Sequence, residues 1–533
     1  MQANSNDKMK NEIFVLEMPL KVEKWQADIL NKRYEYLRQI YNFVQGKLLH
    51  QFRYFEQMED YKACKTLKDK HAFINDHPFY IKGINDKNGN PQPITFNKLS
   101  ISSFAEKLAK RQIGKDKTYI DVGINTNMIK EQTFNLWSSW DKYLYDYSAH
   151  RVAFKKKDEL NIFRYGKKGG GFNGMTVNLQ KMEVSIKTNG RQGSNATFIV
   201  LPIDCRKGMT EYELFALQGG VESINTVAIV RRNVRGQFKY YVQFNIEAEK
   251  PQKGRELGVG RVGIDVGPST VAISSSSRVT IDKLADRCDN IQHDIYIIGR
   301  KIDRSRRANN PQNYNEDGTI KRISRQNGER RVWNKSERYK KLQKERAELL
   351  RKQAAIRKTE HILKANELLE LGDTFIVENN PVSSWTRRAK ETKVNKAGRI
   401  QSKKRYGKSV ANHAPSMFVT ILENKVKSLG GTFVKADVKN AASQFDFTSG
   451  EFTKHEVGER AVTLSNGDKH QRDMLAAFNL QHLNIENGEL KEYDIKQMES
   501  DYPNFCAQER DELNRYIREE KKNDRTAIGA FKK

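Results

Sequence analysis

The sequence predicts an α/β protein of several domains, and three observations support this prediction. Residues 182–246 alternate apolar and polar positions, which is typical of antiparallel strands. Residues 25–55 and 134–147 repeat apolar side chains every three or four positions, which is typical of helices. Two short apolar runs, 262–266 and 374–378, each carry a carboxylate near their end, as buried strands that reach a sheet edge often do. At 533 residues the chain exceeds one ordinary hydrophobic core.

The first half of the chain is predicted to combine a β unit with an inserted helical lobe. Residues 12–22 read as a strand, and residues 23–157 contain the two stretches of helical spacing with a polar, loop-rich stretch between them. The Gly triplet 169–171 lacks the Lys-Ser/Thr of a nucleotide-binding loop, so we interpret it as a linker. Residues 1–22 and 158–255 are therefore expected to form one small antiparallel β-barrel, with the helical lobe inserted between its first two strands.

The charge of the chain indicates a polyanionic partner. Its 95 Lys and Arg residues against 66 acidic ones give a net charge of +29. Basic proteins of this kind gain affinity for nucleic acids by releasing the counterions that phosphates condense. A generically basic protein is the alternative. A membrane-surface role is disfavoured because the charge spreads through the chain and is not confined to one amphipathic helix.

The cysteines and the N-terminus indicate a reducing compartment. The four cysteines lie far apart in sequence, so neither a disulfide framework nor a Cys-x-x-Cys zinc knuckle is predicted. No apolar run approaches 18 residues, and the first seven residues are polar. We therefore expect a cytoplasmic protein with no membrane partner.

Two segments concentrate the positive charge. Between residues 300 and 346, inside a predicted helical region at 291–371, 16 Lys and Arg face 6 acids. This excess is too one-sided for pairing along a helix, so phosphate is the expected counter-charge. Residues 387–408 hold ten Lys and Arg and one acid, as a basic loop over a site would. The candidate nucleic-acid-binding residues are Arg304, Arg306, Arg307, Arg387, Arg388, Lys403, Lys404 and Arg405.

Three acidic residues form the candidate active site. Asp265 and Glu378 lie on predicted strands, and Asp473 opens a predicted helix. Their order of strand pair, strand, helix, strand and helix matches an RNase H-like domain, in which such residues converge. Three carboxylates in one place repel one another unless cations neutralise them, and hard oxygen ligands favour Mg²⁺ or Mn²⁺. Two ions about 4 Å apart would support in-line phosphodiester hydrolysis.

These motifs resemble those of the transposon-encoded TnpB nucleases and of the compact type V CRISPR effectors. Gly-Ile-Asp-Val-Gly at 263–267 resembles their first RuvC motif, and Ile-Val-Glu-Asn at 376–379 resembles their second. The run His-Gln-Arg-Asp at 470–473, followed by Ala-Ala at 476–477, is similar to their third. The resemblance implies that Asp265, Glu378 and Asp473 hold Mg²⁺ and that Arg472 supports the site. It also implies a guide RNA and a target double-stranded DNA as partners.

The resemblance further implies a domain plan. Residues 256–445 and 465–490 would form the RuvC-like nuclease domain, with the basic helical segment 291–371 as an insert. Family members carry a Cys₄ zinc ribbon at the position of residues 446–464, and this interval has no cysteine. We therefore expect a degenerate ribbon without structural zinc. Residues 491–533 are expected to be a charged tail that is helical in part.

The function expected from these features is RNA-guided DNA cleavage by a metal-dependent endonuclease after recognition of a short flanking motif. Two alternatives remain open. An RNA-guided repressor that binds without cutting would be expected to lack a carboxylate, and all three are present. A guide-independent transposase or resolvase of the RNase H fold would not need the helical lobe and β unit that precede the first motif.

Overall fold

A computed structural model describes most of the chain, and two compact units divide it, Met1–Pro251 and Gln252–Lys533. Each unit is described by itself. No helix among the described residues has the length and apolar character needed to cross a bilayer. The described residues are 13–86, 88–113, 123–145, 150–168, 171–172, 174–188, 197–205, 207–248, 255–321, 331–379, 382–388, 391, 406–437, 440–455, 459–486 and 489–519.

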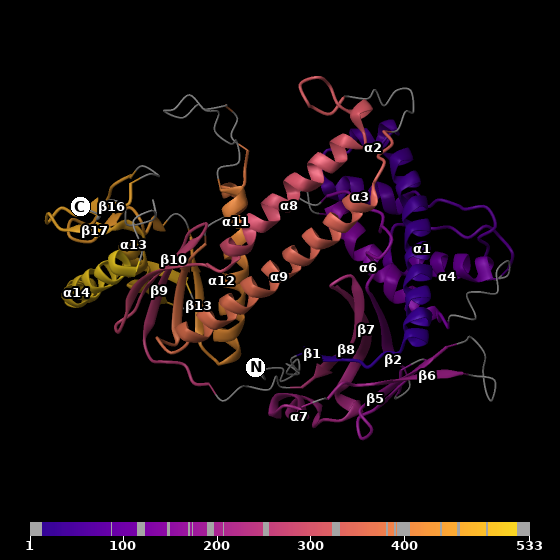
Figure 1. Cartoon of the computed structure of the whole chain (residues 1–533), viewed down its shortest axis with the longest axis horizontal. Coiled ribbons are helices and arrows are strands. Elements are labelled where there is room, and N and C mark those ends of the chain that lie inside the picture. Colours follow the sequence, from indigo (N-terminus) through magenta and orange to yellow (C-terminus); the bar gives the residue numbers. More distant parts are fainter. Residues whose placement is uncertain are drawn as a thin grey trace, which may run out of the picture. The chain divides into compact units, whose positions relative to one another are not determined.

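The first unit contains a curled antiparallel sheet (Figure 1). Its strand order is β1-β8-β7-β2-β3-β4-β5-β6, and a bridge between Leu20 and Ile203 links the ends of the two outermost strands. The sheet joins the start of the chain to its later part, because β1 pairs with β8. Its strands are β1 (Ile13–Pro19), β2 (Ile162–Lys168), β3 (Gly171–Phe172), β4 (Met175–Asn178), β5 (Glu183–Lys187), β6 (Phe198–Pro202), β7 (Ile224–Val234) and β8 (Gln237–Glu247).

Helices pack against this sheet through aromatic side chains. The hydroxyl of Tyr34 donates to the carbonyl of Ile229 on β7, and the guanidinium of Arg231 lies over the Tyr34 ring. Trp140, from the predicted aromatic stripe, is fully buried and donates to Gln45, so it belongs to the core. The helices are α1 (Lys24–Phe55), α2 (Glu59–Ala63), α3 (Leu67–Asp76), α4 (Lys98–Ile113), α6 (Thr126–Tyr145) and α7 (Glu211–Leu217), with the short 3-10 turn η2 (Val221–Ser223).

The second unit is built on a mixed sheet of order β11-β10-β9-β12-β13. The central strand β9 is antiparallel to β10 and parallel to β12, and β12 is also parallel to β13. The α/β character predicted from the sequence is therefore confirmed, and the predicted domain limits stay predictions. The strands are β9 (Arg261–Val266), β10 (Thr270–Ser274), β11 (Val279–Lys283), β12 (Thr374–Glu378) and β13 (Thr432–Ala436).

Helices cover both faces of this sheet. On one face, α9 and α12 bury Leu368 and Phe418 against Val262 and Ile264 of β9. On the other face, α13 and α14 share a core with Ile281 of β11. The helices are α8 (Cys288–Ala308), α9 (Glu337–Leu368), α10 (Val382–Trp385), α11 (Gly407–His413), α12 (Pro415–Ser428), α13 (Arg472–Gln481) and α14 (Ile495–Glu519), with the 3-10 turn η3 (Pro311–Asn313).

The structure adds detail to two segments whose helical character the sequence predicts. The helical region predicted at 291–371 is two helices, α8 and α9, because Pro311 and Gly318 lie in the segment between them and do not continue a helix. The tail predicted after residue 490 includes the long helix α14, which packs into the core. Three small hairpins complete the unit: β14 (Phe445–Asp446) with β15 (Glu451–Phe452), β16 (Ala461–Thr463) with β17 (Lys469–Gln471), and β18 (Leu483–Glu486) with β19 (Glu489–Tyr493).

Candidate active site

Strand alternation places two of the predicted acids on the same face of the sheet. In the parallel pair of β9 and β12, Ile264 is the partner of Val377, so Asp265 and Glu378 are the next residues along each strand. Ile264 and Val377 belong to the core beneath α9 and α12. Because successive side chains in a strand point to opposite faces, Asp265 and Glu378 face the side that α13 covers.

A glycine brings the third acid to the same place. A Cβ on Gly263 would lie less than 3.0 Å from the carbonyl oxygen of Ala477 and from the backbone nitrogen of Gln481, so α13 lies directly on β9 there. Asp265 follows Gly263 by two residues, about 7 Å along the strand. Asp473 precedes Ala477 by four residues, about 6 Å along the helix and on the same face. One close helix–strand contact therefore brings Asp473 toward Asp265.

The electrostatics of Asp265 show that the three acids interact. Burial raises the pKa of the Asp265 carboxyl well above its usual range, and the negative charges of Asp473 and Glu378 raise it further. The guanidinium groups of Arg472 and Arg460 oppose this rise in the pKa. The acids predicted from three separate motifs are thus brought together in the second unit.

Two arginines hold the carboxylate of Asp473. Nη2 of Arg472 lies 3.3 Å from Oδ1 of Asp473, and Nη1 of Arg460 lies 3.2 Å from Oδ2. Arg460 reaches the site because its carbonyl accepts the backbone N–H of Arg472 at 3.0 Å, beside the β16–β17 hairpin. The contact between Arg472 and Asp473 is consistent with the supporting role predicted for Arg472, and that role stays a prediction. Arg460 was not predicted, because no motif in the sequence marks it.

Tyr493 lies near the second acid and was also missed. Its hydroxyl donates to the carbonyl of Asn440 at 2.8 Å. Burial raises the pKa of the Tyr493 hydroxyl, and the charge of Glu378 adds to the rise. Tyr493 follows the last predicted motif, in the segment expected to be a tail, and a single Tyr in a charged stretch carries no functional signal by itself.

The three acids supply the ligand atoms that a hard divalent cation prefers, although their side chains are not arranged as a complete cation site. Carboxylate oxygens are the ligands that Mg²⁺ and Mn²⁺ prefer, and a cation would relieve the repulsion that raises the pKa of Asp265. Within the described part of the chain, no three acidic, His or Cys side chains form a ready cation site. Both oxygens of Asp473 contact arginines instead.

We expect Asp265→Asn to stabilise the protein against heat at neutral pH in the presence of EDTA. The pKa of Asp265 is raised in the folded state, so ionising it costs stability as the pH rises above the ordinary Asp value of about 3.9. The amide cannot ionise, so the variant avoids this cost. Thermal melts from pH 4 to pH 8 would check the prediction: the gap between variant and wild type should widen with pH. A gap independent of pH would contradict it.

The predicted nucleic-acid-binding residues fall into three groups. Arg304 is exposed on α8, whereas Arg306 and Arg307 both pair with Asp303. Arg306 also lies over Trp333, so these two arginines help to build the end of the α8–α9 hairpin. Arg387 and Arg388 are exposed. The remaining predicted residues, Lys403, Lys404 and Arg405, lie outside the described residues.

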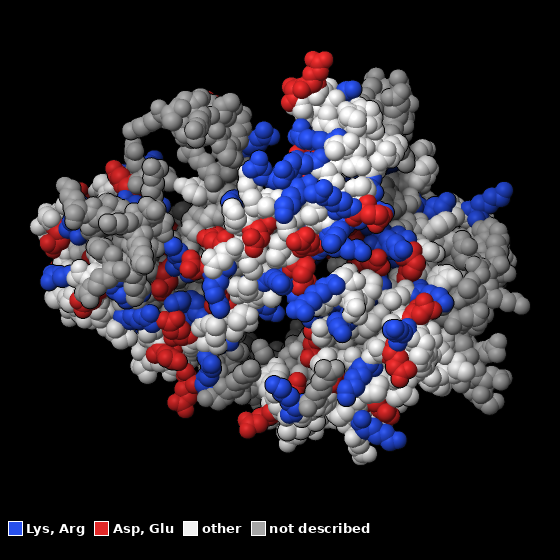
Figure 2. Space-filling model, in the orientation of Figure 1, with Lys and Arg blue, Asp and Glu red and all other residues white. Residues whose placement is uncertain are grey.

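A basic surface covers the two long helices of the second unit. Figure 2 shows Lys and Arg side chains gathered over the region of α8 and α9. We call this surface the hairpin surface and define it by the exposed basic residues of α8 and α9 between positions 300 and 346. They are Arg300, Lys301, Arg304, Arg307, Arg338, Lys340, Lys341, Lys344 and Arg346.

No family model and no curated protein sequence matches the chain. Among solved structures, the chain is similar to a Cas12f1–sgRNA–target DNA complex, with 11% identity, a TM-score of 0.45, and coverage of 90% of this chain and 100% of that one. It is also similar to a CRISPR-Cas12f ternary complex, with 14% identity, a TM-score of 0.27, and coverage of 88% and 83%.

A third similar structure is the mini-RNA-guided endonuclease CRISPR-Cas_phi3, with 12% identity, a TM-score of 0.32, and coverage of 88% of this chain and 92% of that one. The likenesses are too distant to assign an activity to this chain.

Proposed function

We propose that the chain is an RNA-guided DNA endonuclease whose second unit is an RNase H-like, RuvC-type nuclease domain. The observation that carries this proposal is the interaction of Asp265 with Glu378 and Asp473, which come from β9, β12 and α13. The three motifs that supply these acids are far apart in sequence and resemble those of one nuclease class.

The chemistry of the proposed site is phosphodiester hydrolysis. Two Mg²⁺ or Mn²⁺ ions, when bound, would activate a water molecule and stabilise the leaving oxygen. Asp265, Glu378 and Asp473 would hold them. Arg472 keeps the Asp473 carboxylate oriented through its contact with Oδ1. Since Asp473 also contacts Arg460, the guanidinium of Arg460 must share or leave this carboxylate when a cation binds.

The remaining parts of the chain fit a guided nuclease. In this proposal the curled sheet of the first unit is the wedge and its helices form the recognition lobe, and together they would read the short motif beside the target. A guide RNA and a target double-stranded DNA are the proposed partners, and the charge of +29 favours them. Residues 446–464 would hold together without structural zinc.

Sequencing the RNA that co-purifies with the protein expressed from its native locus tests whether the protein binds a guide RNA. The proposal predicts one dominant RNA species with a variable end that defines a target. A plasmid that carries this target beside randomised flanking sequence should then be cut in Mg²⁺, and only with certain flanks. Recovery of bulk cellular RNA without a dominant species, together with uncut plasmid, would contradict the proposal. Cutting that does not depend on the RNA would favour a transposase or resolvase.

We expect the double variant Arg300→Ala/Arg304→Ala to weaken RNA binding at every salt concentration tested. Both arginines are exposed and lie four residues apart on one face of α8. Each phosphate contact contributes about 0.9 to the slope of log affinity against log salt, so the slope should fall by about 2. Filter binding from 50 to 400 mM salt would measure it.

Arg307→Ala is the matched control, because Arg307 is engaged with Asp303 and with the carbonyl of Gly318. This variant should change the slope less than the double variant does. If the slope falls by the same amount for each arginine replaced, pairing with Asp303 does not determine which arginines of the hairpin surface bind RNA.

A further inference from the structure

The helix α14 is joined to the candidate active site through one buried carboxylate. Met498 and Phe505 of this helix share a core with Met474 and Phe478 of α13. Glu509 of α14 lies within this apolar contact and is 4% exposed. A carboxylate so deeply buried is costly unless it is paired and hydrogen-bonded, so its partners indicate what it holds in place.

Both oxygens of Glu509 contact the turn that leads into α13. Oε2 lies 2.6 Å from Nδ1 of His470, and Oε1 accepts the backbone N–H of Gln471 at 2.7 Å. His470 and Gln471 are the last two residues of β17. Glu509, 38 residues after Gln471 in the chain, therefore fixes the end of this strand from α14.

Gln471 links the contact with Glu509 to the position of Asp473. It is the N-cap residue of α13, and its side-chain oxygen accepts the backbone N–H of Met474 at 2.7 Å. Asp473 lies between these two residues, so its backbone is held from both sides. A capped first turn fixes the direction of a helix, and here it also fixes the direction of the Asp473 side chain.

The protons of the network complete a chain of hydrogen bonds. Nε2 of His470 lies 2.7 Å from the hydroxyl of Tyr502, and that hydroxyl donates to Asp468 at 2.7 Å. A carboxylate oxygen accepts hydrogen bonds, so the Nδ1–H of His470 donates to Glu509. A charge-assisted hydrogen bond of this kind is stronger and shorter than a neutral one.

We infer that Glu509 is a positioning residue for the nuclease site, acting on Asp473 through the turn formed by His470 and Gln471. The inference rests on the proposed function, because it assigns Glu509 a part in setting how Asp473 meets a divalent cation. Outer groups that orient a metal ligand typically change metal affinity or activity by about 10- to 100-fold when they are removed. Glu509 acts one step further away, so we expect an effect of about 10-fold.

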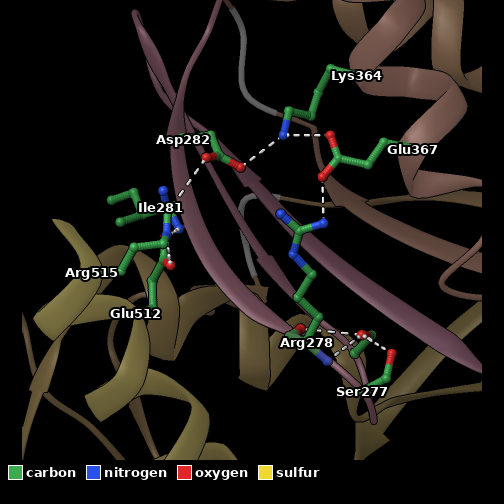
Figure 3. Close-up of polar contacts among 9 residues, drawn as sticks. Ser277, Arg278, Ile281, Asp282, Lys364, Glu367, Glu512 and Arg515 are labelled. Carbon is green, nitrogen blue, oxygen red and sulfur yellow. Dashed lines mark hydrogen bonds and ion pairs between the residues drawn. The ribbon is translucent and has the colours of Figure 1, made fainter. Parts of the chain in front are cut away.

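Glu512 provides a matched control on the same helix. It is also buried and also accepts a backbone N–H, but from Ile281 on β11, at 3.1 Å. Figure 3 shows it with Arg515 and Asp282, in a line of ion pairs that continues to Lys364 and Glu367 of α9. Glu512 thus anchors α14 to the edge strand β11, and its hydrogen bonds and ion pairs among the described residues go to Ile281 and Arg515, not to the β17–α13 turn.

The experiment compares wild type, Glu509→Gln and Glu512→Gln, each as the complex with the co-purified RNA. The amide of Glu509→Gln has one acceptor oxygen where the carboxylate has two, so it can accept from His470 or from the backbone N–H of Gln471 but not from both, and it changes little volume. Titrating Mg²⁺ in the cleavage assay should raise the concentration for half-maximal rate about 10-fold for Glu509→Gln and leave it unchanged for Glu512→Gln. Excess Mg²⁺ should restore most of the rate.

Two readouts do not require cleavage. Hydrogen–deuterium exchange should speed up in the peptide 469–481 for Glu509→Gln and not for Glu512→Gln. Mn²⁺ binding, followed by electron paramagnetic resonance, should weaken in the same variant alone. If both variants change the metal requirement and the exchange equally, Glu509 has only a general packing role and the inference is overturned.

If Glu509→Gln fails to fold, Tyr502→Phe provides a second test of the same inference. It removes the hydroxyl between His470 and Asp468, keeps the ring, and should shift the Mg²⁺ requirement in the same direction by a smaller factor. No shift would overturn the inference. A wild-type complex that does not cut DNA would instead refute the proposed function, and the exchange and Mn²⁺ measurements would still decide whether Glu509 positions Asp473.

Discussion

Replacing Asp265 with Ala is expected to lower target cleavage by about a thousandfold and to leave target binding nearly unchanged. The substitution removes one of three carboxylates that a divalent cation would use, and it removes no positive charge. Metal ions stabilise the transition state of phosphodiester hydrolysis by several kcal/mol. At about 1.36 kcal/mol for each factor of ten, the loss of this term gives the expected decrease. Single-turnover cleavage of a labelled target, with binding measured in parallel, would test it.

Asp282→Ala is the control for this prediction. Asp282 lies on β11 of the same sheet and pairs with Lys364 and Arg515, away from the three acids. This variant should cut at nearly the wild-type rate. Cleavage by Asp265→Ala at a rate similar to that of Asp282→Ala would show that the acids do not form the active site.

The second large effect is expected for Gly263→Ala, which should lower both the stability and the cleavage rate. A Cβ at this position would approach backbone atoms of Ala477 and Gln481 more closely than real Cβ atoms come to their neighbours. Backbone cannot rotate away as a flexible side chain can, so α13 must shift or the site must strain. Overpacking costs about 1–3 kcal/mol, and occasionally more. Urea unfolding and single-turnover cleavage would measure the two losses.

Gly299→Ala is the matched control. Gly299 lies within α8, and a Cβ there would meet nothing within 4 Å. Ala is the better helix former by about 0.5–1 kcal/mol, so this variant should be slightly more stable than wild type and fully active. A Gly263→Ala protein with wild-type stability and activity would mean that α13 does not depend on this close contact.

The face that Asp265 and Glu378 share was predictable from the sequence, because the alternation of side chains within each strand determines it. Strand alternation decides which face Asp265 and Glu378 share, and parallel pairing sets them side by side. The pairing of Arg306 and Arg307 with Asp303 was also visible in the sequence, at spacings of three and four on a helix. This spacing distinguishes Arg306 and Arg307, which pair with Asp303, from Arg304.

Contacts made across the fold were not predictable. Arg460 reaches Asp473 through a short hairpin that no apolar period marks, and Glu509 reaches His470 from a segment predicted only to be a charged, partly helical tail. The buried residues Met498 and Phe505 do recur at helical spacing in that segment. Helical spacing predicts that a helix packs, but it does not identify the partner of a buried Glu.

The most direct test of the central claim is anomalous diffraction from crystals of the RNA complex soaked in Mn²⁺. We expect anomalous density in direct coordination with the carboxylates of Asp265, Glu378 and Asp473, and its loss in Asp265→Ala. Mn²⁺ bound elsewhere on the second unit, with these three carboxylates left without metal, would contradict it.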